Sequence, residues 1–439
     1  MQADKTTLTD LSIFSVEEEH SVFHYLNFTQ TVGGKEWLRY FLSNPFNSLK
    51  TISDTQQTIK KIIATHSQWA NTLVSNGTIM VIEKFYETGI EEIPHNPGVI
   101  SSYYYSIFSA PDFSFIRYSV KHFADFFIGL QQIAALLNNN DNPVLLQTIL
   151  EQIKIRLNKP GLQGLLQKDG NKDYSKQQLL QLGYFLKRRY KQEALELIEI
   201  YSKLDAYYSM ASACKNYQLS FPAFIEADEP VIKAEKLFHP LLQTPVTYDV
   251  GLNQQHNFLF LTGANMGGKS TFIKAVGVSV YLAHIGMGVP AAALQLTLFD
   301  GLLSNINVLD NIAQGESYFF NEVQRIRKTI DKISDGKKWL ILIDELFKGT
   351  NVQDAMKCSS TVIEGLLKIK NAAFILSTHL YEIGEDLKKY PNIQFKYFET
   401  AVVNEQLYFS YQLKDGISND RLGYLILKRE GVVEMLEKL

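Results

Sequence analysis

Residues 263–270 of this 439-residue chain read Gly263-Ala264-Asn265-Met266-Gly267-Gly268-Lys269-Ser270. They fit the pattern G-x-x-x-x-G-K-[ST] at every fixed position. Such a loop needs glycine because its backbone wraps round a polyphosphate with its N–H groups, at angles and distances that a Cβ would obstruct. An apolar run at 258–261 precedes the loop, and a helix-compatible run begins at Thr271. This order of strand, loop and helix predicts that residues 263–271 bind the phosphates of ATP.

The side chains that follow the glycines predict a magnesium site. Lys269 is expected to reach the β- and γ-phosphates, and Ser270 to ligate Mg²⁺. Residues 339–345 are an apolar run that ends in Asp344 and Glu345, and α/β sheets place their ligands at the carboxyl ends of strands. Alone, such a run is a common strand end. Beside a phosphate-binding loop, it predicts Asp344 in the Mg²⁺ shell and Glu345 polarising the attacking water.

A third apolar run, at 372–376, is followed by Ser377-Thr378-His379. A lone histidine is more often a surface residue or a satisfied core residue than a functional one. This histidine is expected at the same end of the same sheet as the loop and Asp344. His379 is therefore a candidate sensor of the γ-phosphate, and it joins Lys269 and Glu345 in the predicted catalytic set.

The character of the chain changes near residue 220. Residues 1–220 are poor in glycine and read mostly as helices, with Leu and Tyr recurring at threes and fours over 176–216. Residues 221–439 alternate short apolar runs with helical stretches, which is typical of a mostly parallel sheet. We therefore expect an α + α/β protein, with a helical core and lever domain at 1–220 and a P-loop ATPase domain with a mostly parallel sheet at 221–439.

The composition limits which cellular compartment and which binding partners we expect. The two distant cysteines and a start without a basic, apolar leader predict a cytoplasmic protein without a disulfide framework. The uncharged stretch 275–299 is as long as a membrane span, but its glycines and Pro290 favour a buried helix, a loop and a strand. The net charge of −3 gives no global attraction to nucleic acid, so such binding requires a local patch.

Residues 151–192 are the candidate for that patch. They carry ten basic and three acidic side chains, a net charge of +7, around a turn-rich tip between two helical arms. A charge run of this kind is usually a solvated face; the alternative is contact with a phosphate backbone. Under that alternative, DNA binding is weak, indifferent to base sequence and sensitive to salt. The candidate contacts are then Lys187, Arg188, Arg189 and Lys191.

These strings resemble the MutS family of ABC-type ATPases, the proteins of DNA mismatch repair. Residues 262–271 resemble the family's T-G-x-N-M-G-G-K-S-T, residues 315–322 its signature around S-T-F-M-x-E, residues 343–355 its I-D-E-L-G-R-G-T-S-x-x-D-G, and residues 377–383 its T-H-x-x-E-L. The likeness covers nearly the whole chain, since residues 11–59 resemble the start of the family's helical core domain. It implies an enzyme that hydrolyses ATP with Mg²⁺ and thereby switches helical arms that contact DNA.

The resemblance also implies roles that the motifs alone do not. Family members share their nucleotide sites in a dimer, so Ser317 of one subunit is expected to approach the nucleotide of the other, although Ser317 also suits an ordinary helix N-cap. Asp354 is expected to belong to the nucleotide site. The chain departs from the family at Phe347, Lys348 and Tyr318, where Gly, Arg and Thr are usual. It begins where the family's core domain begins, so a short form without the mismatch-recognition and connector domains is expected.

Two other classes of protein remain open. A membrane-transporter ATPase shares the P-loop but is expected to carry the signature L-S-G-G-Q. Residues 313–317 of this chain instead read Ala-Gln-Gly-Glu-Ser. A nucleotide-gated interaction protein would bind ATP and partner proteins without DNA. Salt-dependent DNA binding distinguishes this last interpretation from the leading one.

Overall fold

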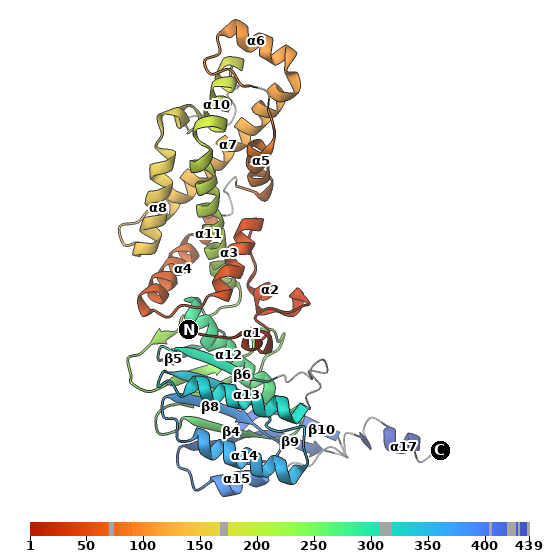
Figure 1. The fold of residues 1–439 in the computed structure, drawn as a ribbon. Coiled ribbons are helices and arrows are strands. Elements are labelled where there is room, and N and C mark those ends of the chain that lie inside the picture. Colours follow the sequence, from red (N-terminus) through yellow and green to blue (C-terminus); the bar gives the residue numbers. More distant parts are fainter. Residues whose placement is uncertain are drawn as a thin grey trace. The chain divides into compact units, whose positions relative to one another are not determined.

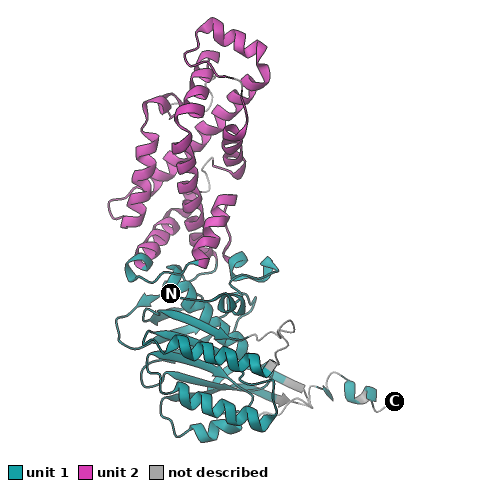
Figure 2. Ribbon diagram, in the orientation of Figure 1, with its two compact units in different colours: residues 1–25, 44–52, 217–439 teal, residues 26–43, 53–216 magenta. Residues whose placement is uncertain are grey.

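The computed structural model (Figure 1) describes residues 1–69, 74–90, 92–166, 174–306, 318–403, 406–418, 427–428 and 431–436. The chain folds into two compact units (Figure 2). Unit 1 comprises residues 1–25, 44–52 and 217–439, and unit 2 comprises residues 26–43 and 53–216. Residues 1–25 and 44–52, which their sequence pattern groups with the helical half, therefore pack with the chain that carries the P-loop.

Unit 2 is built from helices around two long ones, α7 (Ala110–Leu137) and α11 (Lys191–Asn216). α11 packs against α3 and α8, and α7 packs against α5, α8 and α10. The other helices described in this unit are α3 (Val32–Ser43), α4 (Leu49–Trp69, of which residues 53–69 lie in this unit), α5 (Asn76–Glu87), α6 (Val99–Phe108), α8 (Val144–Leu157), η2 (Pro160–Leu162), α9 (Gln163–Leu166) and α10 (Lys176–Arg189).

The helical pattern over 176–216 is interrupted once. α10 ends and α11 begins on either side of Tyr190, whose φ of −121° and ψ of 10° are not helical. The Tyr190 ring is buried, and its hydroxyl donates to the Arg156 carbonyl at 2.7 Å. Tertiary packing of this ring accounts for a break that the periodicity does not show.

A buried carboxylate ties α3 to α11. Asp205 of α11 accepts the backbone N–H of Gln30 at 3.0 Å and both the N–H and the hydroxyl of Thr31, at 2.8 and 2.7 Å. Gly34 packs so close that a Cβ there would lie 2.1 Å from Asp205 Oδ2. Buried polar groups need such partners, so this contact sets the register between the two helices.

Unit 1 contains a six-stranded sheet in the order β10-β9-β4-β8-β7-β6, parallel throughout except for β10. Its strands are β4 (Phe258–Thr262), β6 (Gly301–Asn305), β7 (Trp339–Asp344), β8 (Ala372–Ser377), β9 (Ile393–Val403) and β10 (Gln406–Asp415). β4, β7 and β8 are buried along their whole lengths, as expected of strands covered on both faces. The expectation of a helical part and a mostly parallel sheet is confirmed.

A second sheet and several helices complete unit 1. The sheet has the order β1-β5-β2-β3, with β1 (Ala223–Phe224), β2 (Ile232–Leu237), β3 (Tyr248–Leu252) and β5 (Ala293–Leu296). The helices are α1 (Lys5–Asp10), η1 (Glu18–His20), α2 (Val22–Leu26), α12 (Lys269–Ile285), α13 (Tyr318–Ile333), α14 (Val352–Leu366), α15 (Glu382–Leu387) and α17 (Val432–Leu436).

The uncharged stretch 275–299 is part of this packed unit. It contains the buried helix α12, then a loop, then β5, in the order that its glycines and Pro290 predicted. Within the described residues, no helix is long and apolar enough to cross a membrane.

The N-terminal residues are fastened to the edge of the six-stranded sheet. Gln2 pairs with β6, donating to the Asp300 carbonyl at 2.7 Å and accepting the Leu302 N–H at 2.9 Å. At the end of α1, Asp10 Oδ2 accepts the Ser304 hydroxyl at 2.6 Å and the Arg325 guanidinium at 3.0 Å. Hydrogen bonds and an ion pair therefore place residues 1–10 in unit 1.

His284 anchors the end of α12. Its Nε2 accepts the Phe299 N–H at 3.0 Å, so Nδ1 carries the proton and donates to the Val280 carbonyl at 2.9 Å. The Phe46 N–H donates to the His284 carbonyl at 2.8 Å. Burial lowers the pKa of His284 from 6.5 to about 4, so the ring is neutral in the folded protein.

We predict that acid destabilises unit 1 through His284. The unfolded chain takes up this proton below about pH 6.5 and the folded chain only near pH 4, so stability falls as pH drops between those values. The loss from pH 7 to pH 5 is about 2 kcal/mol for this group. Denaturant unfolding at both pH values should show that the His284→Gln variant loses about this much less than the wild type. The buried His239 is present in both proteins, so its own contribution cancels from the comparison. Equal losses of stability in the two proteins would contradict the prediction.

Candidate nucleotide-binding site

Three adjacent strands bring the predicted site residues to one edge of the sheet. β8 pairs in parallel with β4 on one side and with β7 on the other. Ser377 is the register partner of both Leu261 and Asp344, so the segments that follow these positions start at the same level. The P-loop follows β4, Glu345 follows β7, and His379 follows β8. This edge is the carboxyl end of the strands, where α/β sheets bind their ligands.

The P-loop needs glycine at two positions for its backbone angles. Gly263 has a φ of +131° and Gly268 a φ of +108°, which L side chains rarely adopt. A Cβ at Gly263 would also lie 3.1 Å from the Phe398 carbonyl oxygen. Met266 adopts a φ of +65° with an exposed side chain. α12 begins directly after Gly268, so the free N–H groups of its first turn lie at the loop.

Lys269 lies inside the loop. It is 5% exposed, its Nζ donates to the carbonyls of Gly263 at 2.8 Å and Ala264 at 3.0 Å, and it lies 3.4 Å from His379 Nε2. Burial lowers the pKa of Lys269 to about 8, although the charges of Glu345 and Asp344 act in the opposite direction. The side chain therefore holds a positive charge within the loop at neutral pH.

Asp344 joins the P-loop helix to the two neighbouring strands. It is 8% exposed, and its carboxylate accepts the hydroxyls of Ser270 and Ser377. Ser270 and Asp344, the two predicted Mg²⁺ ligands, are thus in direct contact. A hydroxyl and a carboxylate are hard oxygen donors of the kind that Mg²⁺ prefers.

The donor set fits a magnesium ion that is bound together with a nucleotide. Among the residues that the structure describes, no group of three or more His, Cys, Asp and Glu side chains could hold a metal ion alone. Mg²⁺ commonly takes only one or two protein ligands and completes its shell with phosphate oxygens and water. Two oxygen ligands beside a phosphate-binding loop match that requirement.

Glu345 is held by the side chains of His379 and Lys348. Its Oε1 lies 3.0 Å from His379 Nε2, and its Oε2 lies 3.1 Å from Lys348 Nζ. Burial opposes ionisation of Glu345, but the hydrogen bond from His379 and the charge of Lys348 outweigh it and lower the pKa to about 2. The Glu345 N–H donates to the Ser377 carbonyl at 3.0 Å. The carboxylate therefore stays ionised just beyond the carboxyl end of β7, where its charge acts on Lys269.

The structure also adds residues that the sequence reasoning did not assign to the site. Ser377 binds Asp344, and Lys348, noted only as a departure from the family, pairs with Glu345. Asp354 lies apart from these contacts: it is exposed in the first turn of α14, where its carboxylate accepts the Asn351 amide at 2.6 Å and its N–H donates to Asn351 Oδ1 at 3.0 Å. Ser317 falls outside the described residues.

Residues 259–436 match the family model of MutS domain V. The DNA mismatch repair protein MutS of Thermotoga maritima is 30% identical over 249 residues, which are 56% of this chain and 31% of that protein. The protein of the same name from Petrotoga mobilis is 28% identical over 242 residues, or 54% of this chain and 29% of that protein. Residues 259–436 therefore carry a domain V of the MutS family. The matched region spans less than a third of the length of these MutS relatives.

The four candidate DNA contacts lie outside the matched region and have different surroundings. Lys187 Nζ donates to the carbonyls of Phe85, Tyr86 and Thr88 at the end of α5. Burial lowers the pKa of Lys187. Arg189 contacts His95 Nε2 at 3.1 Å, Lys191 lies 5.8 Å from the centre of the Tyr86 ring, and Arg188 is exposed. Lys187 therefore caps α5, whereas Arg188, Arg189 and Lys191 present their charges to solvent.

Other cations of the 151–192 segment pair with acidic residues of α11. Arg156 Nη2 lies 2.6 Å from Glu196 Oε2, and Lys159 Nζ lies 3.9 Å from Glu193 Oε1. These ion pairs weaken the positive electrostatic field that a net charge of +7 would otherwise produce. The charge run is thus divided between contacts within the protein and solvent-exposed positions on α10 and α11.

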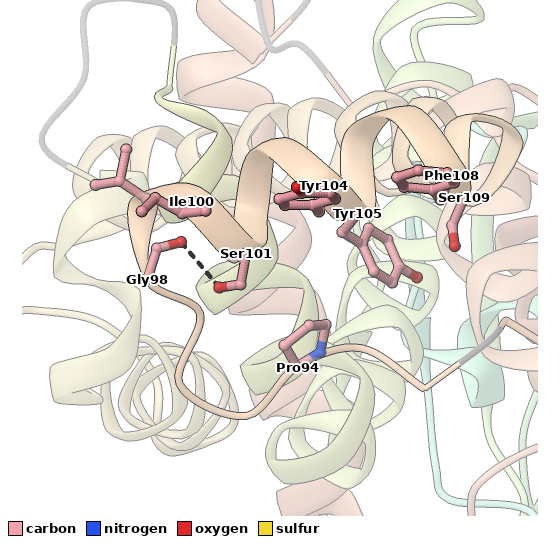
Figure 3. A pocket seen from close by; sticks show the side chains of 9 residues that line it. Pro94, Gly98, Ile100, Ser101, Tyr104, Tyr105, Phe108 and Ser109 are labelled. Carbon is pink, nitrogen blue, oxygen red and sulfur yellow. Dashed lines mark hydrogen bonds between the residues drawn. The ribbon is translucent and has the colours of Figure 1, made fainter.

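A pocket on α6 differs in chemistry from the nucleotide site (Figure 3). It has a volume of about 860 Å³ and is lined by Pro94, Gly98, Val99, Ile100, Ser101, Tyr104, Tyr105, Phe108 and Ser109. None of these nine lining residues is charged, so the pocket offers nothing to neutralise a triphosphate. The Tyr104 and Phe108 rings lie parallel, 5.8 Å apart, and are 59% and 78% exposed.

Proposed function

We propose that this protein, whose residues 259–436 match MutS domain V, is a Mg²⁺-dependent ATPase whose nucleotide cycle switches helical arms that contact DNA. The observation that carries the proposal is the meeting of Lys269 after β4, of Asp344 and Glu345 at the end of β7, and of His379 after β8, which lies between those two strands. A P-loop lysine, a carboxylate beside the P-loop serine and a second ionised carboxylate are the groups that in-line phosphoryl transfer to water requires.

Each side chain then has a distinct task. The backbone N–H groups of residues 263–271 and Lys269 would bind the phosphates, and Ser270 and Asp344 would hold Mg²⁺, which neutralises phosphate charge when bound. Glu345 would orient and polarise the attacking water, because its low pKa keeps it ready to accept a hydrogen bond. His379, in contact with both Lys269 and Glu345, would respond to the γ-phosphate. Asp354 would join the nucleotide site from α14.

We predict that Glu345→Gln separates binding from hydrolysis. The amide keeps the size of the side chain but cannot polarise water as a carboxylate does, so turnover with Mg²⁺ should fall by about a hundredfold or more while ATP binding persists. Phosphate release and nucleotide titration measure the two effects. Glu226→Gln, the same change at an exposed position of unit 1, serves as the control. Unchanged turnover in Glu345→Gln would remove this residue from the mechanism.

The family resemblance supports a homodimer in which nucleotide sites are shared. Ser317 of one subunit would then complete the site built on Lys269 of the other. Ser317→Ala and Lys269→Ala subunits, each inactive alone, would form mixed dimers with one intact and one doubly defective site. After random exchange, such a mixture should recover about a quarter of wild-type hydrolysis, because half of the dimers are mixed and each has one working site. No recovery above the sum of the two homodimers would mean that the sites are not shared.

DNA contact is proposed for the exposed cations of unit 2. Arg188, Arg189 and Lys191 occupy neighbouring positions where α10 meets α11. Arginine and lysine side chains bind phosphates, and phosphate contacts carry no direct information about the base sequence. Binding would therefore be driven by the release of counterions and would weaken steeply with salt.

We predict that replacing Arg188, Arg189 and Lys191 together by Gln flattens the salt dependence of DNA binding. If the wild type neutralises about four phosphates, log K falls with log salt at a slope of about −3.6, and losing three contacts reduces it to about −0.9. Lys187 is left in place because its removal would uncap α5. Gln at Lys357, Lys368 and Lys370, exposed residues of unit 1, gives the same charge change as a control. An unaltered slope in the first variant would identify these cations as a solvated face.

A second candidate function is a nucleotide-gated interaction protein that does not bind DNA. The uncharged helix α6 favours it, since Val99, Ile100, Tyr103, Tyr104, Ile107 and Phe108 are each between 54% and 78% exposed. Exposed apolar patches of this kind mark interaction surfaces. The absence of any salt-dependent DNA binding by the wild type would favour this function over the first.

A further inference from the structure

The start of α13 is fastened to the segment that carries Glu345. This segment, residues 345–349, is the first part of the connection from β7 to α14, which runs over residues 345–351. The Glu322 carboxylate of α13 accepts two of its backbone N–H groups, from Lys348 at 3.1 Å and from Gly349 at 3.2 Å. Glu322 is 5% exposed, so its charge is compensated inside the protein rather than by water.

An aromatic contact makes a second connection between the same two elements. The Phe319 ring of α13 lies 5.7 Å from the Phe347 ring, and both belong to the apolar cluster around β7 and β8. Phe347 is 4% exposed. Three residues apart on α13, Phe319 and Glu322 face the same side of the helix and reach the same segment.

The segment itself has an unusual backbone that requires external support. Glu345 has a φ of +64° and Phe347 a φ of +58°, in the left-handed region that non-glycine residues rarely adopt. Such conformations persist only where the surrounding structure holds them. The N–H bonds to Glu322 and the packing of Phe347 on Phe319 are contacts that hold this segment.

Lys348 connects α13 to the Glu345 carboxylate. Lys348 donates its backbone N–H to Glu322 and places its Nζ 3.1 Å from Glu345 Oε2. His379 fixes the other carboxylate oxygen from β8. The direction of the Glu345 side chain is therefore set by α13 on one side and by the sheet on the other.

We propose that Glu322 and Phe319 are positioning residues for Glu345: α13 holds residues 345–349 in their left-handed conformation and thereby aims the Glu345 carboxylate. The inference rests on the proposed ATPase function and adds two residues to it. Neither residue belongs to the P-loop or to α12, which carry the groups proposed to bind phosphate. Their loss should therefore reduce turnover and leave nucleotide affinity nearly unchanged.

The test compares Glu322→Ala and Glu322→Gln in the full chain. The alanine variant leaves both N–H groups without their acceptor, whereas the glutamine variant keeps one carbonyl oxygen. Because displacement of a reacting group by about 1 Å costs about a hundredfold in rate, kcat should fall about a hundredfold in Glu322→Ala and about tenfold in Glu322→Gln. The Kd for ATP should change less than about threefold in both. Asp331→Ala, which removes an exposed acidic residue of α13, is the control.

The aromatic contact provides an independent pair of variants. Phe319→Ala should lower kcat, whereas Phe320→Ala, an exposed phenylalanine one position along α13, should not. Adding Phe347→Gly to Phe319→Ala should restore part of kcat, because glycine adopts a positive φ without a packing partner. A kcat in Glu322→Ala and Phe319→Ala within about twofold of wild type would overturn the proposal. A loss of ATP affinity as large as the loss of kcat would overturn it too.

Hydrogen exchange separates this inference from the ATPase proposal. In wild-type protein the amides of residues 345–349 should exchange slowly, and in Glu322→Ala they should exchange at least tenfold faster, while β4 and α12 keep their protection. Unchanged exchange in this segment would show that Glu322 does not hold it. If wild-type protein failed to hydrolyse ATP, the proposed function would fall, but the exchange result would still decide whether α13 holds the segment.

Discussion

The burial of the Lys269 ammonium among P-loop carbonyls, where the charges of Glu345 and Asp344 favour it, is the constraint on which the candidate nucleotide site depends. Lys269 and Asp344 are each less than a tenth exposed, and buried charges require nearby opposite charges and hydrogen bonds. Here the partners come from three strands that are far apart in the chain: the P-loop carbonyls after β4, Asp344 and Glu345 at β7, and Ser377 and His379 at β8. The parallel sheet, with β8 between β4 and β7, brings these groups to one edge. The long crossover connections and the fully buried strands follow from that requirement.

The composition of the site was largely predictable, because its main residues have chemically specific spacing. A glycine-rich loop with Lys-Ser, and an apolar run that ends in Asp-Glu, leave few alternative uses. The supporting contacts were less accessible. Ser377 is an ordinary residue at a strand end, and nothing local indicates that its hydroxyl donates to Asp344. Glu322 accepts hydrogen bonds from the backbone N–H groups of residues 348 and 349. Every residue except proline has such a group, so no pattern of side chains in the sequence indicates this contact.

The fold was predictable in kind and less so in its long-range packing. Apolar runs and helical periodicity indicated a helical part and a parallel sheet, but periodicity describes only local structure. Gly277 of α12 illustrates what local patterns cannot show, since a Cβ there would lie 2.6 Å from Leu11 of the N-terminal segment. The charge run at 151–192 had the same limitation. Its composition is visible in the sequence, but the partners of Arg156, Lys159 and Lys187 appear only in the folded chain.

Backbone strain in the site explains one departure from the family pattern. Residue 347 has a φ of +58°, a conformation that glycine adopts freely, and the resemblance places glycine at this position in other members. Here a phenylalanine occupies it, so the left-handed backbone must be stabilised by packing. The ring is buried in the apolar cluster of β7 and β8 and contacts Phe319. Replacing glycine by phenylalanine therefore exchanges conformational freedom for a contact with α13, and the conformation of the segment that carries Glu345 becomes dependent on the position of that helix.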